Sequence, residues 1–448
     1  MSNLERAANL ASWQGHLMRE SIEITGGAWN AAIGEIRTRA QDEQDEVRTL
    51  LKSLTSTAPP VDEGAAWHKF SEIARHSQEV FCESLDVLGG LAFRGTLKDR
   101  DIWAMADDLI EDISSITRRQ PALTVPASQE VLSKTLARLI RLRFPEWDIW
   151  ALPFVAHEYG RVVVDELRLE AGKERPGNKL RDLDTFLAAE ESRLTEADEQ
   201  LRIVRAGSEA APQLVARVAE RAQRRAELHL QVLAADGFAT FMMGPAYAYS
   251  AILLRLNPVD DDGMNGPPSA LRAAVVLSML EEIDRRAKSQ QYRDVVSDLR
   301  GAWQTLADLG DTSTGPDHTE VERINAELVP RLWQAYSEQF VPGAEYTASA
   351  SNDESYLIAQ KWATFWFKDF DPESPLPTPD DLRKGNRLRD VLNAAWLIRR
   401  KQDGPATGRI EEAARRLWQA IRNKRDEAEI QRRGYQLSGF TGTATQKP

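Results

Sequence analysis

Helical spacing of apolar residues is the feature that most constrains what this chain can fold into. Along most of its length, apolar residues recur at positions i, i+3, i+4 and i+7, as in "AWHKFSEIARHSQEVFCESLDVL" at 66–88. Alternating patterns typical of strands are scarce, and the "VVV" at 162–164 lies inside a helical pattern. We therefore expect a multi-helical fold that is all-α or nearly so.

Segments rich in proline, glycine and aspartate divide the helical stretches and predict loops. They lie at 55–64, 120–128, 171–178, 257–269, 309–319, 371–379 and 402–408, and 438–448 has the composition of a tail. Thr195 with Asp198 resembles a capping box, which predicts a helix start there. Thr378-Pro379-Asp380-Asp381 predicts another start, with a cap, a proline and acids in the first turn.

The loops give a working division into three regions. We expect an N-terminal helical region at 1–100, a central helical core at 101–300, and a C-terminal helical region at 301–448 that ends in a short flexible tail. No fixed-period repeat is visible in the sequence.

The charge of the chain bears on its partners. A net charge of -12 argues against general nucleic-acid binding, which usually rests on a basic face. Basic clusters do occur, but acidic residues flank them, and we interpret them as solvated helix faces. These clusters are Arg138, Arg141 and Arg143, and Arg221, Arg224 and Arg225.

Cysteine usage and hydropathy indicate where the protein works. The single cysteine, Cys82, excludes an internal disulfide and a thiolate metal cluster, which suits a reducing cytosol. Its helical apolar surroundings predict a buried packing residue. The first residues lack the apolar core of a secretory signal, and no apolar run approaches the ~18 residues of a membrane helix. We expect a cytoplasmic protein without a membrane partner.

The stretch "HEYGR" at 157–161 carries the strongest chemical signal. In an HExxH helix, two histidines four residues apart lie on one face and bind zinc, and the glutamate polarises the zinc-bound water. Here the first histidine is His157 and the glutamate is Glu158, but the second histidine is replaced by Arg161.

Three blocks in order make the signal more specific. "RFPEW" and "LPFVAHEYGR" are followed by "VLAADGFATFMMGPA" at 232–246 and by "GPPSALR" at 266–272. This order resembles that of gluzincin-type bacterial zinc metallopeptidases, with an HExxH helix, an ExxAD helix and an HPPxxLR segment. The resemblance covers roughly residues 141–280 and implies a metallopeptidase-like central helical unit.

The departures from that family fall on its metal-binding groups. Arg161 replaces the second histidine, Val232 replaces the ligand glutamate, and Gly266 replaces the histidine before the two prolines. Arginine stays protonated and cannot become a ligand. By the resemblance, the degenerate site comprises His157, Glu158, Arg161, Val232, Asp236 and Gly266, and we expect no bound metal or other cofactor.

The favoured hypothesis is a catalytically inactive metallopeptidase-like protein that binds a protein or peptide. It would act as a regulatory component, in keeping with a bacterial multi-component system of defence or stress type. One alternative is an active zinc peptidase with a site rebuilt from His157, His229 and Asp236. Others are a hydrolase that uses Glu158 without a metal, and a helical scaffold with no peptidase ancestry. The sequence leaves the oligomeric state open.

Three further patterns yield expectations. Arg161 lies three residues after Glu158, so we expect it to serve as an internal cation for Glu158, Asp236 or both. The acidic run 260–262 predicts a polar loop, because it lacks the alternation of an EF-hand. The aromatic residues Trp362, Phe365 and Trp366 predict a core stripe, with a partner interface as the alternative.

Overall fold

The computed structural model describes most of the chain beyond residue 100. The described ranges are 101–127, 139–143, 148–173, 178–206, 212–258, 266–309, 318–347, 355–367, 370–373, 375, 388–401 and 407–441, with a few isolated positions before residue 93. The chain divides into two compact units, one of residues 1–107 and 121–147 and one of residues 108–120 and 148–448. The border expected near residue 300 falls within a helix of the second unit.

The first unit contains the strands found among the described residues. β1 (Leu123–Ala127) pairs in parallel with β2 (Leu139–Arg143). The side chain and backbone nitrogen of Thr124, at the start of this sheet, both donate to Asp107 on α4 (Asp101–Thr117). Two sequence predictions are wrong here: 120–128 contains a strand as well as a loop, and Arg141 and Arg143 lie on a strand rather than a helix face. Short alternating segments of five residues carry too little periodicity to separate from a helical background.

The second unit is helical throughout its described residues. Together with α4, the described helices confirm the all-α fold. They are α5 (Phe154–Ala171), α6 (Lys179–Ala206), α7 (Pro212–Met243), α8 (Pro245–Ser250), a π-helical segment η2 (Ala251–Arg255), α9 (Ser269–Ala287), α10 (Arg293–Leu309), α11 (His318–Gln339), α12 (Ser355–Phe365), α13 (Leu388–Arg399) and α14 (Thr407–Thr441).

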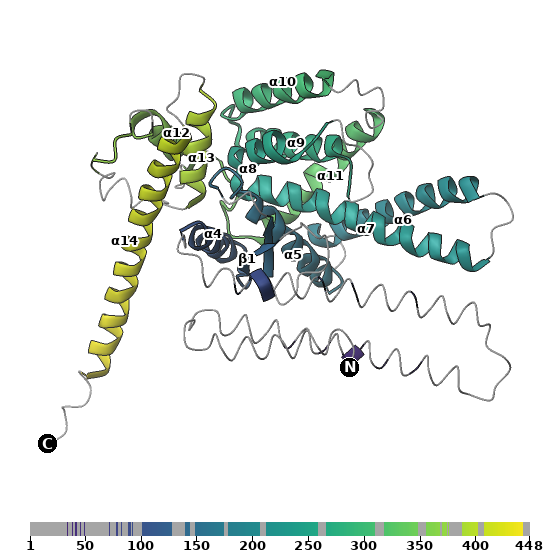
Figure 1. Cartoon of the computed structure of the whole chain (residues 1–448), viewed down its shortest axis with the longest axis horizontal. Helices are drawn as coiled ribbons and strands as arrows, with labels where there is room; N and C mark the ends of the chain where they lie inside the picture. The colour runs from purple at the N-terminus through teal and green to yellow at the C-terminus, as the bar shows by residue number, and fades with distance from the viewer. Residues whose placement is uncertain are drawn as a thin grey trace. The chain divides into compact units, whose positions relative to one another are not determined.

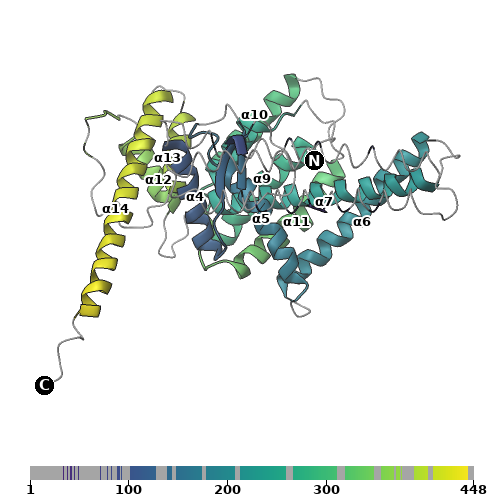
Figure 2. The same ribbon diagram turned by 60° about the horizontal axis from the view of Figure 1, so that its bottom comes forward.

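Helix α7 is the centre of this unit. It packs along α5 and α6, and α9 and α11 also pack against it. Figures 1 and 2 show α6 and α7 as two long helices side by side, with α9 and α10 over the other end of α7. Helices α12, α13 and α14 form a second group in the same unit, and α14 runs away from that group.

Glycines set the distances between α7 and its neighbours. A Cβ atom at Gly160 on α5 would lie 2.6 Å from the ring of Phe238 on α7, so the two helices approach more closely than an alanine would allow. Gly244 ends α7 with a positive φ of 59° and is followed by Pro245 at the start of α8. The side chain of Asn393 holds this break, since it accepts from Ala246 N and donates to the carbonyl of residue 243.

Helix ends in the second unit agree with four of the predicted breaks. One helix ends and the next begins at or near the borders of 171–178, 257–269, 309–319 and 402–408, whose central residues lie outside the described ranges. The helix start predicted at Thr195 is wrong, because α6 begins at Lys179 and runs through it. Asn178 accepts from Leu180 N and caps α6 instead, while the Thr195 hydroxyl donates to the carbonyl four residues before it. The expected tail at 438–448 begins inside α14.

Other predictions have mixed outcomes. Cys82 is exposed, so its prediction as a buried residue is wrong. On α12 and just after it, Trp362 is buried, Trp366 is half-buried and Phe365 is 75% exposed, so the aromatic stripe is core only in part. The start predicted at Thr378 and the acidic run 260–262 lie outside the described residues. No helix in the described part of the chain combines the length and apolarity needed to cross a bilayer.

Candidate functional site

Helix α5 places three side chains of the HEYGR stretch in one cluster. His157 is buried, and its Nδ1 lies 3.2 Å from Oε1 of Glu158. The other carboxylate oxygen of Glu158 lies 3.4 Å from Nη1 of Arg161, one turn further along. The side chains of Glu158 and Arg161 are only 15% and 10% exposed, so this pair is largely shielded from solvent. Arg161 therefore lies against Glu158 as expected.

Asp236 on α7 faces the same cluster and is fully buried. Arg272 on α9 forms a two-point ion pair with it, with Nε 2.7 Å from Oδ2 and Nη2 2.9 Å from Oδ1. Tyr247 on α8 donates its hydroxyl to Oδ1. His157 Nε2 lies 3.4 Å from the same oxygen. Thus His157, Glu158 and Asp236 converge, and the cation on Asp236 is Arg272, whose role the sequence analysis missed.

Arg272 stands at a position that its own helix does not favour. It is in the first turn of α9, where the helix dipole favours negative charge and disfavours positive charge. Its placement is explained by the tertiary ion pair, because a buried carboxylate without a partner is far more costly than the dipole effect. The only sequence signal for this role is that Arg272 closes the "GPPSALR" block.

His157 lies between the two ion pairs. Its Nδ1 faces Oε1 of Glu158 at 3.2 Å. Its Nε2 lies 3.3 Å from Nη2 of Arg272 and 3.4 Å from Oδ1 of Asp236. His157 thus links the Glu158–Arg161 pair to the Asp236–Arg272 pair.

The environment keeps Glu158 ionised. Burial raises the pKa of this carboxyl, but the hydrogen bond and positive charge of His157, together with the charges of Arg161 and Arg272, outweigh burial and bring the pKa to about 2. Burial and the negative charge of Asp236 raise the pKa of Tyr247 well above 10, so this phenol stays protonated and donates. The cluster therefore sets two arginine side chains against the carboxyl groups of Glu158 and Asp236.

The donor set does not fit zinc. A zinc site uses three protein ligands from His, Cys, Asp or Glu, and no group of three among the described residues is arranged so that it could hold a metal ion. Glu158 faces Nδ1 of His157, whereas Asp236 faces Nε2 on the other side of the ring. The nitrogen of His157 and the oxygens of Asp236 that face the centre already contact Arg272. A zinc ion placed here would be repelled by two positively charged side chains, Arg272 and Arg161.

The remaining predicted site residues lie apart from this cluster or face the core. Val232 is buried on α7, and Gly266 lies in the bend before α9. His229 lines a different small pocket, on the side of α7 that faces α6 and α11, and two of its other lining residues are Glu190 and Arg323. The structure therefore does not place His229 in a group with His157 and Asp236 that could hold a metal.

Gln231 extends the cluster toward the surface. Its side-chain oxygen lies 3.3 Å from Nη2 of Arg161, and its nitrogen donates to Asp165 at 2.7 Å. The bond to Asp165 returns to α5, so this chain of contacts ties α5 to α7 a second time. Gln231 precedes Val232, the position at which the resembling family has its ligand glutamate.

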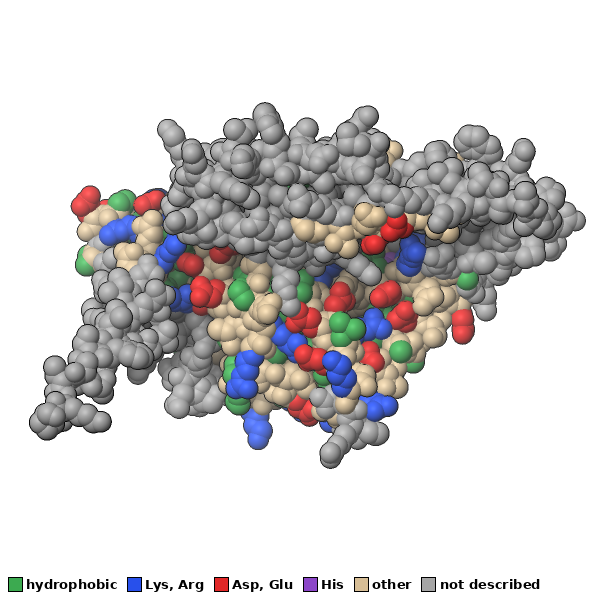
Figure 3. All heavy atoms as spheres, turned by 90° about the horizontal axis from the view of Figure 1, so that it is seen from below, with side chains coloured by type: hydrophobic (Ala, Val, Ile, Leu, Met, Phe, Trp, Pro, Cys, Tyr) green, Lys and Arg blue, Asp and Glu red, His purple; other side chains and the backbone are tan. Residues whose placement is uncertain are grey.

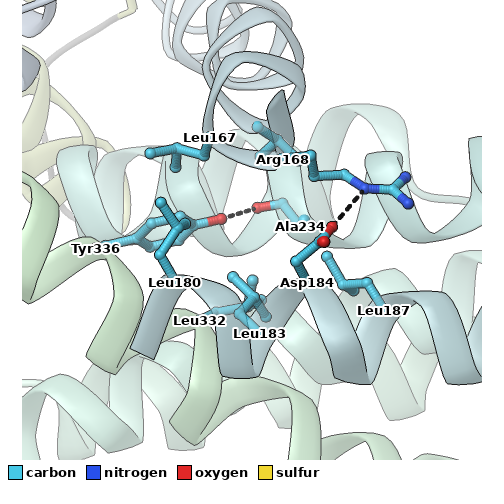
Figure 4. A pocket seen from close by; sticks show the side chains of 10 residues that line it. Leu167, Arg168, Leu180, Leu183, Asp184, Leu187, Ala234, Leu332 and Tyr336 are labelled. Atoms are coloured by element: carbon cyan, nitrogen blue, oxygen red, sulfur yellow. Dashed lines mark hydrogen bonds and ion pairs between the residues drawn. The ribbon is translucent and has the colours of Figure 1, made fainter. Parts of the chain in front are cut away.

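A second small pocket lies between α5, α6, α7 and α11 (Figure 4). Its walls are mainly leucine side chains, and Tyr336 donates to the carbonyl of Ala234 across one end. Arg168 pairs with Asp184 at the other side, 3.4 Å apart. No polar group in this pocket is left to orient a substrate, so we regard it as a packing defect of the core.

The described surface in Figure 3 mixes charges. Acidic and basic side chains alternate over this face, without a stripe of one sign. On α7, Arg224 is exposed and Arg225 half-buried, which agrees with the solvated helix face predicted for them.

Comparison of the chain with known protein families, curated proteins and solved structures finds no match.

Proposed function

We propose that this protein is a non-catalytic, metallopeptidase-like component that binds a protein or peptide. The observation that carries the proposal is the full engagement of His157, Glu158 and Asp236 by arginine side chains. In the resembling family, the histidine at the position of His157 binds the metal, the glutamate at that of Glu158 polarises water, and the aspartate at that of Asp236 supports a ligand histidine. Here each of them is instead a partner in a closed network of charges.

The protonation states support a non-catalytic role. A general base works best when its pKa is near the working pH. Glu158, with a pKa of about 2, holds too little affinity for a proton to act as an efficient base at neutral pH. Both ring nitrogens of His157 already face protein groups, Nδ1 facing Glu158 and Nε2 facing Arg272 and Asp236. These features also weigh against a metal-free hydrolase that uses Glu158.

Support for a binding role comes from the retained framework. Helices α5 and α7 are in close contact beside the cluster, because Gly160 packs directly against Phe238. Gly244 ends α7 and lets the chain turn into α8. Glu158 and Arg272 keep 15% and 20% of their side chains exposed, so the cluster has an edge at the surface. A peptide could contact that edge through its own charged groups. The bacterial, defence-type context and the cytoplasmic location remain part of the proposal.

Peptide cleavage and peptide contact can be tested together. The protein would be incubated with a defined mixture of peptides, with and without added zinc, and the products analysed by mass spectrometry. We expect all peptides to remain intact. A photo-crosslinking residue at Gln231, at the edge of the cluster, should capture a subset of peptides, and the same residue at Glu281 on the exposed pair with Arg300 should not.

Two results would refute this function. Zinc-dependent cleavage that a chelator stops would establish a peptidase. Equal crosslinking from both positions would mean that the cluster edge selects no peptide.

A further inference from the structure

We infer that the site takes a guanidinium group as its central cation, supplied by Arg272, in place of a metal ion. This inference rests on the contacts around Arg272 alone and goes beyond the proposed function. It would hold equally in a helical scaffold that binds no peptide.

The first argument is geometric. Arg272 comes from α9 and reaches Asp236 on α7 and His157 on α5, so one side chain bridges three helices. Its Nε and Nη2 match the two oxygens of Asp236 at 2.7 and 2.9 Å, which is the two-point pairing that a planar guanidinium makes and an ammonium cannot. Nη2 also faces Nε2 of His157.

The second argument is electrostatic. Asp236 is fully buried, and burying a lone carboxylate requires either protonation or a cation. A single positive charge balances it, because Glu158 already has Arg161. A zinc ion would add two charges where one is needed, and His157 and Asp236 give it only two protein ligands.

The third argument concerns which arginine is essential. Arg161 pairs with Glu158, whose side chain is 15% exposed, at a separation of 3.4 Å. Arg272 pairs with a carboxylate that has no exposure and at a much shorter separation. Water can replace part of the lost contact at Glu158 but not at Asp236.

Chemical rescue tests the inference directly. The variant Arg272→Ala removes the atoms of ethylguanidinium from the site. We expect its melting temperature to fall by roughly 5–10 °C. Ethylguanidinium at tens of millimolar should then restore a large part of the loss, whereas ethylammonium should not. As a matched control, Arg300→Ala removes an exposed pair with Glu281, and should shift the melting temperature by no more than about 2 °C without rescue.

A second variant stays decisive where Arg272→Ala fails to fold. Arg272→Lys keeps one positive charge but replaces the planar guanidinium by an ammonium, which cannot make the two-point pairing with both oxygens of Asp236. We expect this variant to fold and to melt below the wild type.

Three results would overturn the inference. One is an Arg272→Lys variant as stable as the wild type. Another is an Arg272→Ala variant as stable as the wild type, or one rescued equally by ethylguanidinium and ethylammonium. The third is zinc that binds the wild-type chain and is lost in Asp236→Asn. Any of these would leave the peptide-cleavage test of the proposed function unaffected.

Discussion

Glu158→Gln is the substitution that most directly tests the electrostatics of the cluster. The change keeps the size and most of the shape of the side chain but removes its charge and its titration. In the wild type the carboxyl has a pKa of about 2, against 4.5 for an unpaired glutamate, because the bond from His157 and the nearby guanidiniums outweigh the effect of burial.

The magnitude follows from linkage between protonation and folding. A group whose pKa is lower in the folded state contributes stability that is fully present above its unfolded pKa and is lost as the pH falls toward its folded pKa. A fall in pKa from 4.5 to about 2 corresponds to about 3 kcal/mol, since a tenfold change in an equilibrium constant is ~1.4 kcal/mol. The stabilising effect of Glu158 should therefore be complete above about pH 5 and mostly lost near pH 2.

Urea denaturation of wild type and variant at several pH values measures this effect. We expect Glu158→Gln to lower the free energy of unfolding at pH 7, and the difference between the two proteins to shrink by about 2 kcal/mol on going to pH 3. The control is Glu281→Gln, whose exposed pair with Arg300 should contribute under about 1 kcal/mol at either pH. A wild-type-to-variant difference for Glu158 that stays constant from pH 7 to pH 3 would refute the assigned pKa.

Three further outcomes are expected. Gly160→Ala should lower the free energy of unfolding by about 1–3 kcal/mol, because the new methyl would lie 2.6 Å from the Phe238 ring. The control is Gly301→Ala on α10, where the methyl meets nothing within 4 Å and should stabilise the protein by ~0.5–1 kcal/mol. Equal effects of the two substitutions in thermal unfolding would contradict the close helix contact. Arg161→Ala should destabilise by about 1–2 kcal/mol, less than Arg272→Ala, and Arg161→Lys by less still. A change under about 0.5 kcal/mol in urea denaturation would show that the Glu158 pair is solvated. The double variant Arg161→His, Val232→Glu should not bind zinc, whereas the triple variant with Arg272→Met should, as measured by titration calorimetry. Zinc binding by the double variant would contradict the position of Arg272.

The sequence predicted the parts of this structure that depend on short-range patterns. The helical setting of the HEYGR stretch and the pairing of Arg161 with Glu158 follow from spacings of three and four residues, which a helix fixes by itself. The start of α6 was misplaced because the Thr195 hydroxyl can bond within a helix as well as cap one.

Contacts between distant segments could not be predicted in the same way. Asp236 and Arg272 are 36 residues apart, and their pairing depends on how α9 crosses α7. The sequence placed both residues in blocks that resemble a known site, but no spacing rule says which arginine reaches the buried carboxylate. The exposure of Cys82 and of Phe365 likewise depends on which helix face the rest of the fold covers.

The position of Arg272 decides what building a metal site here would require. Replacing Arg161 and Val232 supplies a second histidine and a glutamate, but it leaves a guanidinium on Nε2 of His157 and on both oxygens of Asp236. Zinc would have to displace a cation that is covalently attached to α9 and paired with a fully buried carboxylate. The new glutamate at position 232, which is only 2% exposed, would add a buried charge that nothing but the metal could neutralise. Arg272 must therefore be replaced before the new side chains can bind zinc.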